Sequence, residues 1–139
     1  MRTVAQKMGV KAGARAHFVD APEKVLNSME LPELRGDTDL NGRFDHLHLF
    51  VITQDDMRRH FPPLRDHMAE GGMLWVSWPK GGRLDTDLNM RSVIRIGYEL
   101  GLVESICLRV DEVWAGLKFT RPKPGKTYDN SYGTLPHQT

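Results

Sequence analysis

"MLWVSWPKGGRLDTD", residues 73 to 87, is the stretch of sequence that decides the fold. Its first six residues are apolar apart from Ser77, which is typical of a strand that is covered on both faces. Pro79 ends that strand because it lacks a backbone donor, and Gly81 and Gly82 favour a loop. Asp87 then fits the N-cap of a helix, since the apolar residues after it recur at helical spacing. A buried strand therefore leads through a loop into a helix.

The same order of strand, polar cap and helix occurs twice earlier in the chain. Residues 14–19 are expected to form a strand, and Asp20 fits the N-cap of the helix that follows it. Residues 44–53 form the clearest strand, because their apolar residues first alternate and then run continuously. Thr53 fits the cap of the next helix. Strands that alternate with helices predict a parallel sheet with helices on both of its faces.

The remaining segments are less regular. Residues 31–43 are rich in turn formers and leave room for at most one short edge strand. Pro62 and Pro63 are expected to interrupt the third helix, so that the following "LRDHMAEGG" forms a second short helix with a glycine stop. Residues 102–121 are expected to form two strands that are divided by a turn at Asp111.

Together these elements predict an α/β fold: a single three-layer Rossmann-like domain whose mostly parallel sheet ends in an antiparallel C-terminal strand pair. A chain of 139 residues is the size of one ordinary domain. We expect this domain to span residues 1–121. Residues 122–139 are rich in proline, glycine and polar residues, and we expect them to form a flexible tail.

The composition argues against several classes of protein. One cysteine rules out an internal disulfide, and neither a signal peptide nor a membrane-spanning apolar run is visible, so we expect a cytoplasmic protein. A net charge of +1 argues against binding to nucleic acid. An alternative hypothesis is that the chain binds nucleic acid through the basic residues Lys118, Arg121, Lys123 and Lys126.

The carboxyl ends of the expected parallel strands mark where a ligand binds, because open α/β sheets hold ligands beyond those ends. In residues 79–83, glycines let the backbone approach a ligand, while Lys80 and Arg83 add positive charge. Asp85 and Asp87 oppose an anion there, so a solvent-exposed loop is the alternative interpretation. The candidate ligand-binding residues are Asp20, Thr53, Trp78, Lys80, Arg83, Asp87, Glu112 and Trp114.

Two residue pairs have both a functional and a structural interpretation. Trp75 and Trp78 lie three residues apart on one strand and so point to opposite faces. We expect Trp75 in the core, and Trp78 either in the core or at the wall of a pocket. His46 and His48 share a face, as metal ligands can, but no third ligand has a supportive spacing, so we expect no metal site. These patterns identify no catalytic residue.

Motifs spread over residues 4–121 resemble those of a bacterial family, domain of unknown function 3052. The motifs are "KxGxKxG" from residue 7, "GGxLWVxWPK" from residue 71 and "DExWxGLxF" from residue 111. The resemblance implies a small Rossmann-like domain without an assigned reaction. It also implies a set of site residues, namely Trp78, Lys80, Asp87, Glu112 and Trp114. A structural interpretation of the same set is tryptophan packing, a helix cap, and a surface ion pair between Lys80 and Glu112.

The order of "GVKAGARAHFVDAP", "FDHLHLFVIT" and "LRDHMAEGGMLWVSWPKGG" more distantly resembles the class I S-adenosylmethionine-dependent methyltransferases. That family has a glycine-rich cofactor loop after its first strand, whereas this chain has "VDAPEKV", with Pro22 and no glycine. The acidic residue expected at the end of the second strand has only Asp37 and Asp39 as candidates. The resemblance implies S-adenosylmethionine as the cofactor, and these departures argue against it.

Two functional hypotheses follow from the sequence. The first is a non-catalytic binding or regulatory module whose partner is a small molecule or a protein, including a second copy of the chain in a homodimer. The missing glycine loop favours it, because Pro22 and Glu23 obstruct close approach of the backbone to a cofactor. The alternative is a small methyltransferase-like enzyme with an atypical cofactor loop, whose site would be the rim formed by Asp20, Thr53, Trp78 and Lys80.

Overall fold

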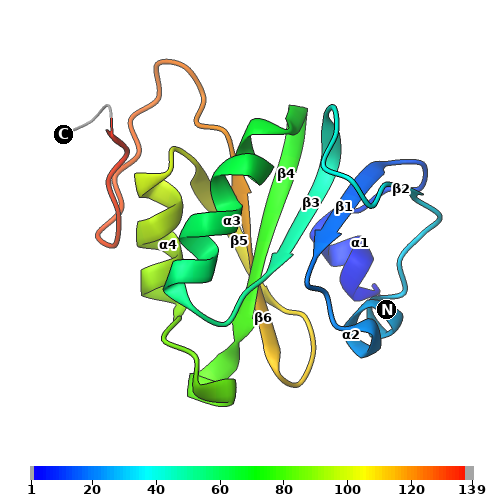
Figure 1. Cartoon of the computed structure of the whole chain (residues 1–139). Coiled ribbons are helices and arrows are strands. Elements are labelled where there is room, and N and C mark those ends of the chain that lie inside the picture. Colours follow the sequence, from blue (N-terminus) through cyan, green and yellow to red (C-terminus); the bar gives the residue numbers. More distant parts are fainter. Residues whose placement is uncertain (1, 137–139) are drawn as a thin grey trace.

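A six-stranded sheet runs through the centre of the molecule and separates two layers of helices (Figure 1). This computed structural model describes residues 2–136. The strands are β1 (Arg15–Val19), β2 (Arg35–Gly36), β3 (Phe44–Phe50), β4 (Met68–Pro79), β5 (Val103–Arg109) and β6 (Trp114–Thr120). The helices are α1 (Val4–Met8), α2 (Glu23–Met29), α3 (Gln54–Asp66), α4 (Met90–Glu99) and a short 3-10 segment, η1 (Lys80–Asp85). None of these helices, within the described residues, has the length and apolar character needed to cross a membrane.

The strand order is β2-β1-β3-β4-β6-β5, which confirms the predicted α/β fold. Strands β2, β1, β3 and β4 are parallel, whereas β6 is antiparallel to both β4 and β5. The chain moves outward from β1 to β2 and then returns to place β3 on the other side of β1. This reversal makes the carboxyl ends of β1 and β3 the place where sheets of this kind bind ligands.

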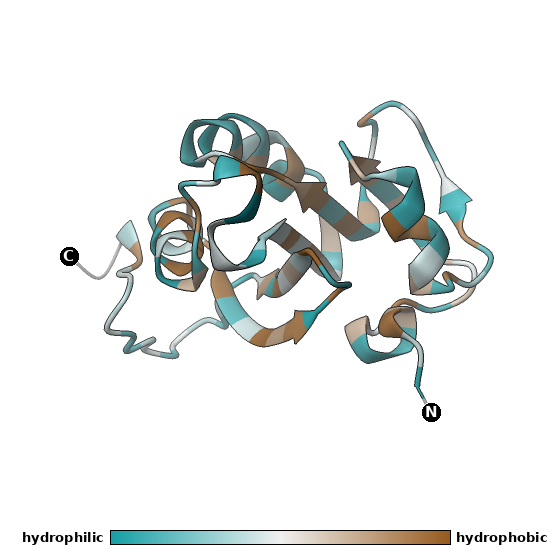
Figure 2. Cartoon of the chain, turned by 90° about the horizontal axis from the view of Figure 1, so that it is seen from below, coloured by the Kyte–Doolittle hydropathy of each residue, from teal (hydrophilic) through white to brown (hydrophobic). Residues whose placement is uncertain are grey.

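Each face of the sheet has its own hydrophobic core. One core joins Leu49 and Val76 of the sheet to α3 and α4, and the other joins Phe50 and Trp75 to α1 and α2. Figure 2 shows the two helix layers on either side of the sheet. Trp78 belongs to the first core and Trp75 to the second, so the two indoles point to opposite faces, as predicted. Burying one large apolar side chain contributes roughly 1.5–3 kcal/mol, so these cores hold the three layers together.

Helix α3 passes through Pro62 and Pro63 without a break, so the predicted interruption of this helix is wrong. Phe61 and Leu64, on either side of the prolines, are buried in the core. Phe61 also packs edge-on against Phe119, with 5.4 Å between the ring centroids. Packing of these side chains outweighs the roughly 3 kcal/mol that a proline costs inside a helix.

Residues 68–72 form the start of β4, so the second short helix predicted from the sequence is also wrong. β4 pairs with β3 on either side of residues 69–72, which bulge out of the ladder. A Cβ on Gly72 would lie 2.9 Å from the carbonyl oxygens of Phe44 and Ala69, closer than a side chain tolerates. Glycine is therefore present because the bulge brings backbones together, and it does not mark a helix stop.

Two predicted helix caps differ from those in the structure. Asp20 has a φ of 55° and precedes the N-cap of α2, which is Pro22 and makes no side-chain hydrogen bond. Asp87 lies ahead of Asn89, whose side chain accepts a hydrogen bond from the Ser92 N–H at 2.9 Å. The Ser92 hydroxyl in turn accepts from the Asn89 N–H. This reciprocal pair satisfies two backbone donors at once, so α4 begins at this cap.

The segment after β6 contacts the domain at several points. Leu135 is buried in the core beneath α3 and α4, and the Asn130 side chain donates to the Glu104 carboxylate of β5 at 2.8 Å. The Arg91 guanidinium of α4 lies 5.3 Å from the centroid of the Tyr132 ring. The division of the chain into a domain and a flexible tail at residue 121 stays a prediction. The end of that predicted tail, residues 137–139, lies outside the described residues.

Gly97, within α4, allows the helix to lie close to β6, because a Cβ there would overlap with the ring of Phe119. We expect Gly97→Ala to lower the free energy of unfolding by about 1–3 kcal/mol, since overpacking outweighs the better helix propensity of alanine. Urea unfolding measures this change. Gly36→Ala, at an open position of β2, is the control and should change stability by less than about 0.5 kcal/mol. Equal stability of Gly97→Ala and wild type would contradict the packing of α4 on the sheet.

Candidate functional site

The carboxyl ends of β1, β3 and β4 lie at one edge of the sheet, together with the turn between β5 and β6. We call this edge, at the bottom of Figure 1, the carboxyl rim. The β5–β6 turn reaches it because β6 is antiparallel to β4, which places Trp114 opposite Pro79. The rim therefore gathers segments that lie far apart in the sequence.

Backbone acceptors of the β5–β6 turn hold the loop after β4. The N–H of Lys80 donates to the carbonyl oxygen of Val113 at 2.7 Å, and the Arg83 guanidinium donates to the carbonyl oxygen of Glu112 at 3.1 Å. None of the ion pairs in the described structure joins Lys80 to Glu112, so the surface ion pair considered from the sequence does not form. The sheet nevertheless brings together four of the predicted site residues: Lys80, Arg83, Glu112 and Trp114.

Thr53 and Asp87 meet on the other side of the same loop. Thr53 caps α3, as predicted, by accepting a hydrogen bond from the Asp56 N–H at 3.1 Å. Asp87 accepts from the Gln54 N–H at 2.8 Å, and the Gln54 side chain donates to the Asp87 carbonyl oxygen at 2.9 Å. Both predicted site residues therefore have a structural role at the start of α3.

The two remaining predicted site residues lie apart from these groups. Trp78 is buried in the core beneath α3 and α4, so of its two interpretations the structural one describes its position. Asp20 is exposed at the end of β1, and its carboxylate has no hydrogen bond or ion pair within residues 2–136. Neither side chain contributes to a shared site with Lys80 and Glu112.

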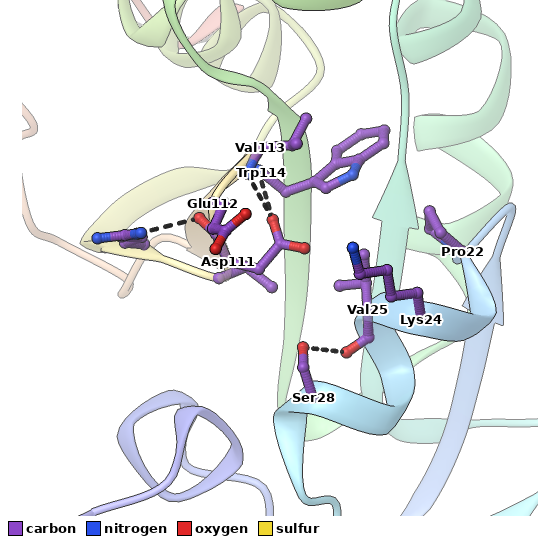
Figure 3. A pocket seen from close by; sticks show the side chains of 10 residues that line it. Pro22, Lys24, Val25, Ser28, Asp111, Glu112, Val113 and Trp114 are labelled. Atoms are coloured by element: carbon purple, nitrogen blue, oxygen red, sulfur yellow. Dashed lines mark hydrogen bonds between the residues drawn. The ribbon is translucent and has the colours of Figure 1, made fainter.

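A cleft of about 450 Å³ opens at the carboxyl rim between α2 and the β5–β6 turn (Figure 3). We call it the rim cleft. Trp114 lines it and packs edge-on against Phe50, with 5.2 Å between the ring centroids. Pro22 and Val25 add apolar surface from the opposite wall. The cleft thus combines a fixed indole with the first turn of α2.

Charged side chains line both walls of the rim cleft. Figure 3 shows the Lys24 amine on the α2 wall and the carboxylates of Asp111 and Glu112 on the wall formed by the turn. One Asp111 oxygen accepts from the N–H groups of Val113 and Trp114, each at 2.8 Å, and this fixes the turn. The Lys24 amine and the Glu112 carboxylate have no partner in the described part of the chain. Both are therefore available to a ligand.

Reasoning from the sequence missed Lys24, although it found Glu112 and Trp114 on the opposite wall. Lys24 lies in the first turn of α2, directly after β1, and the β5–β6 turn is more than 80 residues later in the chain. The sequence could have indicated Lys24 only by its position, because both segments follow strand ends that the expected topology brings to one edge of the sheet. Only the strand order brings these two walls together.

Two histidines of β3 are buried on the sheet face that α1 and α2 cover. His48 Nε2 lies 2.7 Å from the Ser77 hydroxyl, and the His48 ring stacks on Phe50 with 4.3 Å between centroids. Both ring nitrogens of His46, and Nδ1 of His48, have no hydrogen-bond partner in the described part of the chain. Among the described residues, no three His, Cys, Asp or Glu side chains lie close enough together to hold a metal ion.

Burial keeps both histidines neutral. Burial first, and the charge of Lys118 second, lower the pKa of His46 from 6.5 to about 4. Burial first, and the neighbouring His46 second, lower the pKa of His48 well below its usual value. At neutral pH each ring therefore presents one nitrogen that donates and one that accepts.

Comparison with known proteins identifies similar folds. No protein-family model matches the chain, and no curated protein matches it. It resembles an S-adenosylmethionine-dependent methyltransferase from Clostridium acetobutylicum, with a TM-score of 0.56 and 10% identity over 86% of this chain and 88% of that one. It also resembles the glycopeptide N-methyltransferase MtfA, with a TM-score of 0.55 and 12% identity over 85% and 87% of the two chains. For the magnesium protoporphyrin IX methyltransferase from Synechocystis the TM-score is 0.51, with 10% identity over 86% and 78%. At such identities these similarities establish the fold alone.

The buried histidines make stability depend on pH. An unfolded histidine has a pKa near 6.5, so acidification protonates the unfolded chain first, while the folded chain excludes the proton. We expect the free energy of unfolding to fall below about pH 6.5, by up to about 2 kcal/mol at about pH 5 for His46 alone. The contribution of His46 should become complete only below about pH 4, once the folded state also takes up the proton.

Urea unfolding of wild type and of His46→Phe at a series of pH values measures this dependence. On acidification the free energy of unfolding of the variant should fall by less than that of wild type, because phenylalanine does not titrate. The same free energy of unfolding at about pH 7 and about pH 5 in wild type would contradict a neutral, buried histidine pair.

Proposed function

We propose that this chain is a non-catalytic binding module built on the methyltransferase fold, with the rim cleft as its ligand site. The observation that carries this proposal is the junction between β1 and α2, which consists of Asp20, Ala21 and Pro22 without a glycine. In the methyltransferases that the sequence resembles, a glycine-rich loop at this point allows close approach of the backbone to the cofactor. Here a side chain occupies every position, so these residues do not fit S-adenosylmethionine.

The second acidic position argues in the same direction. β2 pairs only with Arg15 and Ala16, at the beginning of β1. Asp37, which follows β2, therefore lies level with His17, whose Nδ1 donates to the Asp37 carbonyl oxygen at 2.8 Å. The Asp37 carboxylate accepts a hydrogen bond from the Arg15 guanidinium at 3.2 Å. A cofactor at the carboxyl rim, where β1 ends, would lack this acidic partner.

The lining of the rim cleft supports a ligand with an apolar body and charges of both signs. Trp114 and Val25 offer apolar surface, while the Lys24 amine and the Glu112 carboxylate are unpaired on the two walls. A small molecule or a peptide segment that carries a carboxylate and an amine would pair with both. Charge-assisted hydrogen bonds of this kind fix the orientation of the ligand as well as adding affinity.

A small methyltransferase-like enzyme with an atypical loop is the alternative. The strand order and the similarity to three methyltransferase structures favour it, by analogy of fold alone. Membership of the domain of unknown function 3052 family, a homodimer and a cytoplasmic location are inferences from the sequence, and none of them distinguishes the two functions.

The proposal is tested by titrating the whole chain with S-adenosylmethionine and S-adenosylhomocysteine in a thermal-unfolding assay. A ligand at about 100 times its dissociation constant adds close to 2.7 kcal/mol, which is a shift of several degrees for a domain of this size. We expect no shift from either compound. A shift that is lost in Lys80→Ala and kept in the control Lys126→Ala would contradict the proposal and favour the methyltransferase.

The ligand class is tested separately, with zwitterionic dipeptides that carry one apolar side chain as the probes. We expect saturable changes in the amide NMR signals of Val113 and Trp114. Affinity should fall roughly 10-fold in Lys24→Gln, because one charge-assisted hydrogen bond is lost. The control Lys126→Gln should bind as wild type does. If no dipeptide perturbs these signals, the rim cleft is not the site of such a ligand.

A further inference from the structure

A second cleft, of about 600 Å³, opens at the opposite edge of the sheet, where the parallel strands begin. We call it the amino-edge cleft. Its walls are the loop of residues 9–14 between α1 and β1, and the side chains of His46, Met73 and Lys118 from β3, β4 and β6. It lies on the sheet face that α1 and α2 cover, and the rim cleft lies at the other end of that face.

His46 is an unusual lining residue. Its side chain is fully buried, yet neither of its ring nitrogens has a hydrogen-bond partner among residues 2–136. An unpaired buried polar atom costs folding free energy, and a native structure rarely keeps two on one ring. Met73 lines the cleft beside it, and the sulfur of this unbranched, adaptable side chain accepts a hydrogen bond from the Trp75 indole N–H at 3.1 Å. A ligand in this cleft would supply the partner that these nitrogens lack.

The loop of residues 9–14 offers unpaired backbone donors to the same cleft. Gly13 and Ala14 donate their N–H groups to the carbonyl oxygens of Glu33 and Lys11. The N–H groups of Lys11 and Ala12, in contrast, have no acceptor among the described residues. Adjacent free N–H groups in a glycine-containing turn are typical of sites that hold an anion.

The charged side chains of the cleft favour an anion as well. The Lys118 ammonium has no ion pair or hydrogen bond within residues 2–136, although Asp45 lines the same cleft. The Asp45 carboxylate accepts instead from the Arg15 N–H at 2.9 Å, so the β-sheet backbone already engages it. Lys11 also lines the cleft. The cleft is therefore lined by two lysines and by one carboxylate that already accepts a hydrogen bond.

We propose that the amino-edge cleft binds a small organic anion that carries a phosphate or a carboxylate group. The anionic oxygens bind the Lys118 ammonium and the N–H groups of Lys11 and Ala12, and His46 donates a further hydrogen bond. The volume exceeds that of an inorganic ion, so the organic part of the ligand packs against Val10 and Met73. This site is independent of the rim cleft and of the function proposed for it.

Amide NMR titrations of the whole chain test this proposal, with glycerol 3-phosphate as the phosphate probe, succinate as the carboxylate probe, and the ionic strength held constant with sodium chloride. We expect the amide signals of Lys11 and Ala12 and the ring nitrogen signals of His46 to change and to saturate together. Saturation with glycerol 3-phosphate alone identifies a phosphate ligand, and saturation with succinate alone identifies a carboxylate ligand. The absence of a saturable change with either probe overturns the proposal.

Variants separate the site from a general effect of charge. Lys118→Gln should weaken binding of the probe roughly 10-fold, because it removes one charge-assisted hydrogen bond. Lys126→Gln, which removes the same charge outside the cleft, should leave the affinity unchanged. His46→Phe should also weaken binding without lowering thermal stability at neutral pH, since it removes two unpaired nitrogens. Equal affinity of Lys118→Gln and wild type would overturn the proposal even if His46→Phe failed to fold.

Discussion

The pairing of β3 with both β1 and β4 is the constraint on which the rest of the structure depends. β3 hydrogen-bonds to a parallel strand on each side, so both of its faces have to be covered by helices. Leu49 points to the core of α3 and α4, and Phe50 points to the core of α1 and α2. A register shift of one residue would exchange these faces and would move His46 and His48 beneath the wrong helices. The two cores and the two clefts are therefore set by one register.

Much of this architecture could be predicted from local patterns, because the residues that form a strand or a cap lie close together in the sequence. The apolar run of β3 and the Thr53 cap are examples. The predicted caps at Asp20 and Asp87 were wrong although a cap is a local feature, and other predictions were wrong where a distant contact decides the structure. Phe61 holds α3 helical across its prolines through its contact with Phe119, a residue of the last strand. The walls of the rim cleft likewise depend on which strands are neighbours, and Lys24 carries no local signal of this.

The sheet face beneath α1 and α2 differs in character from the other face. His46, His48, Phe50 and Trp114 follow one another along it, with ring centroids 5.8, 4.3 and 5.2 Å apart. The core of the opposite face consists of aliphatic and aromatic side chains, and the Glu104 carboxylate beside it keeps one buried oxygen without a hydrogen-bond partner among the described residues. The two buried histidines thus lie on one face, and the clefts lie at the two ends of that face. Proteins commonly tolerate such a loss of stability where a site requires it.

The bulge at residues 69–72 has a consequence for how the protein can change. In an ordinary strand, inserting one residue turns every later side chain to the opposite face. Here pairing with β3 resumes at Met73, and β6 pairs with the same part of β4. A change in the length of the bulge therefore leaves Trp75 and Trp78 on the faces that they occupy now. Gly71 of the bulge borders the amino-edge cleft. Insertions and deletions in this segment can therefore reshape the cleft while the core stays intact, which makes it a natural place for ligand preference to diverge among related chains.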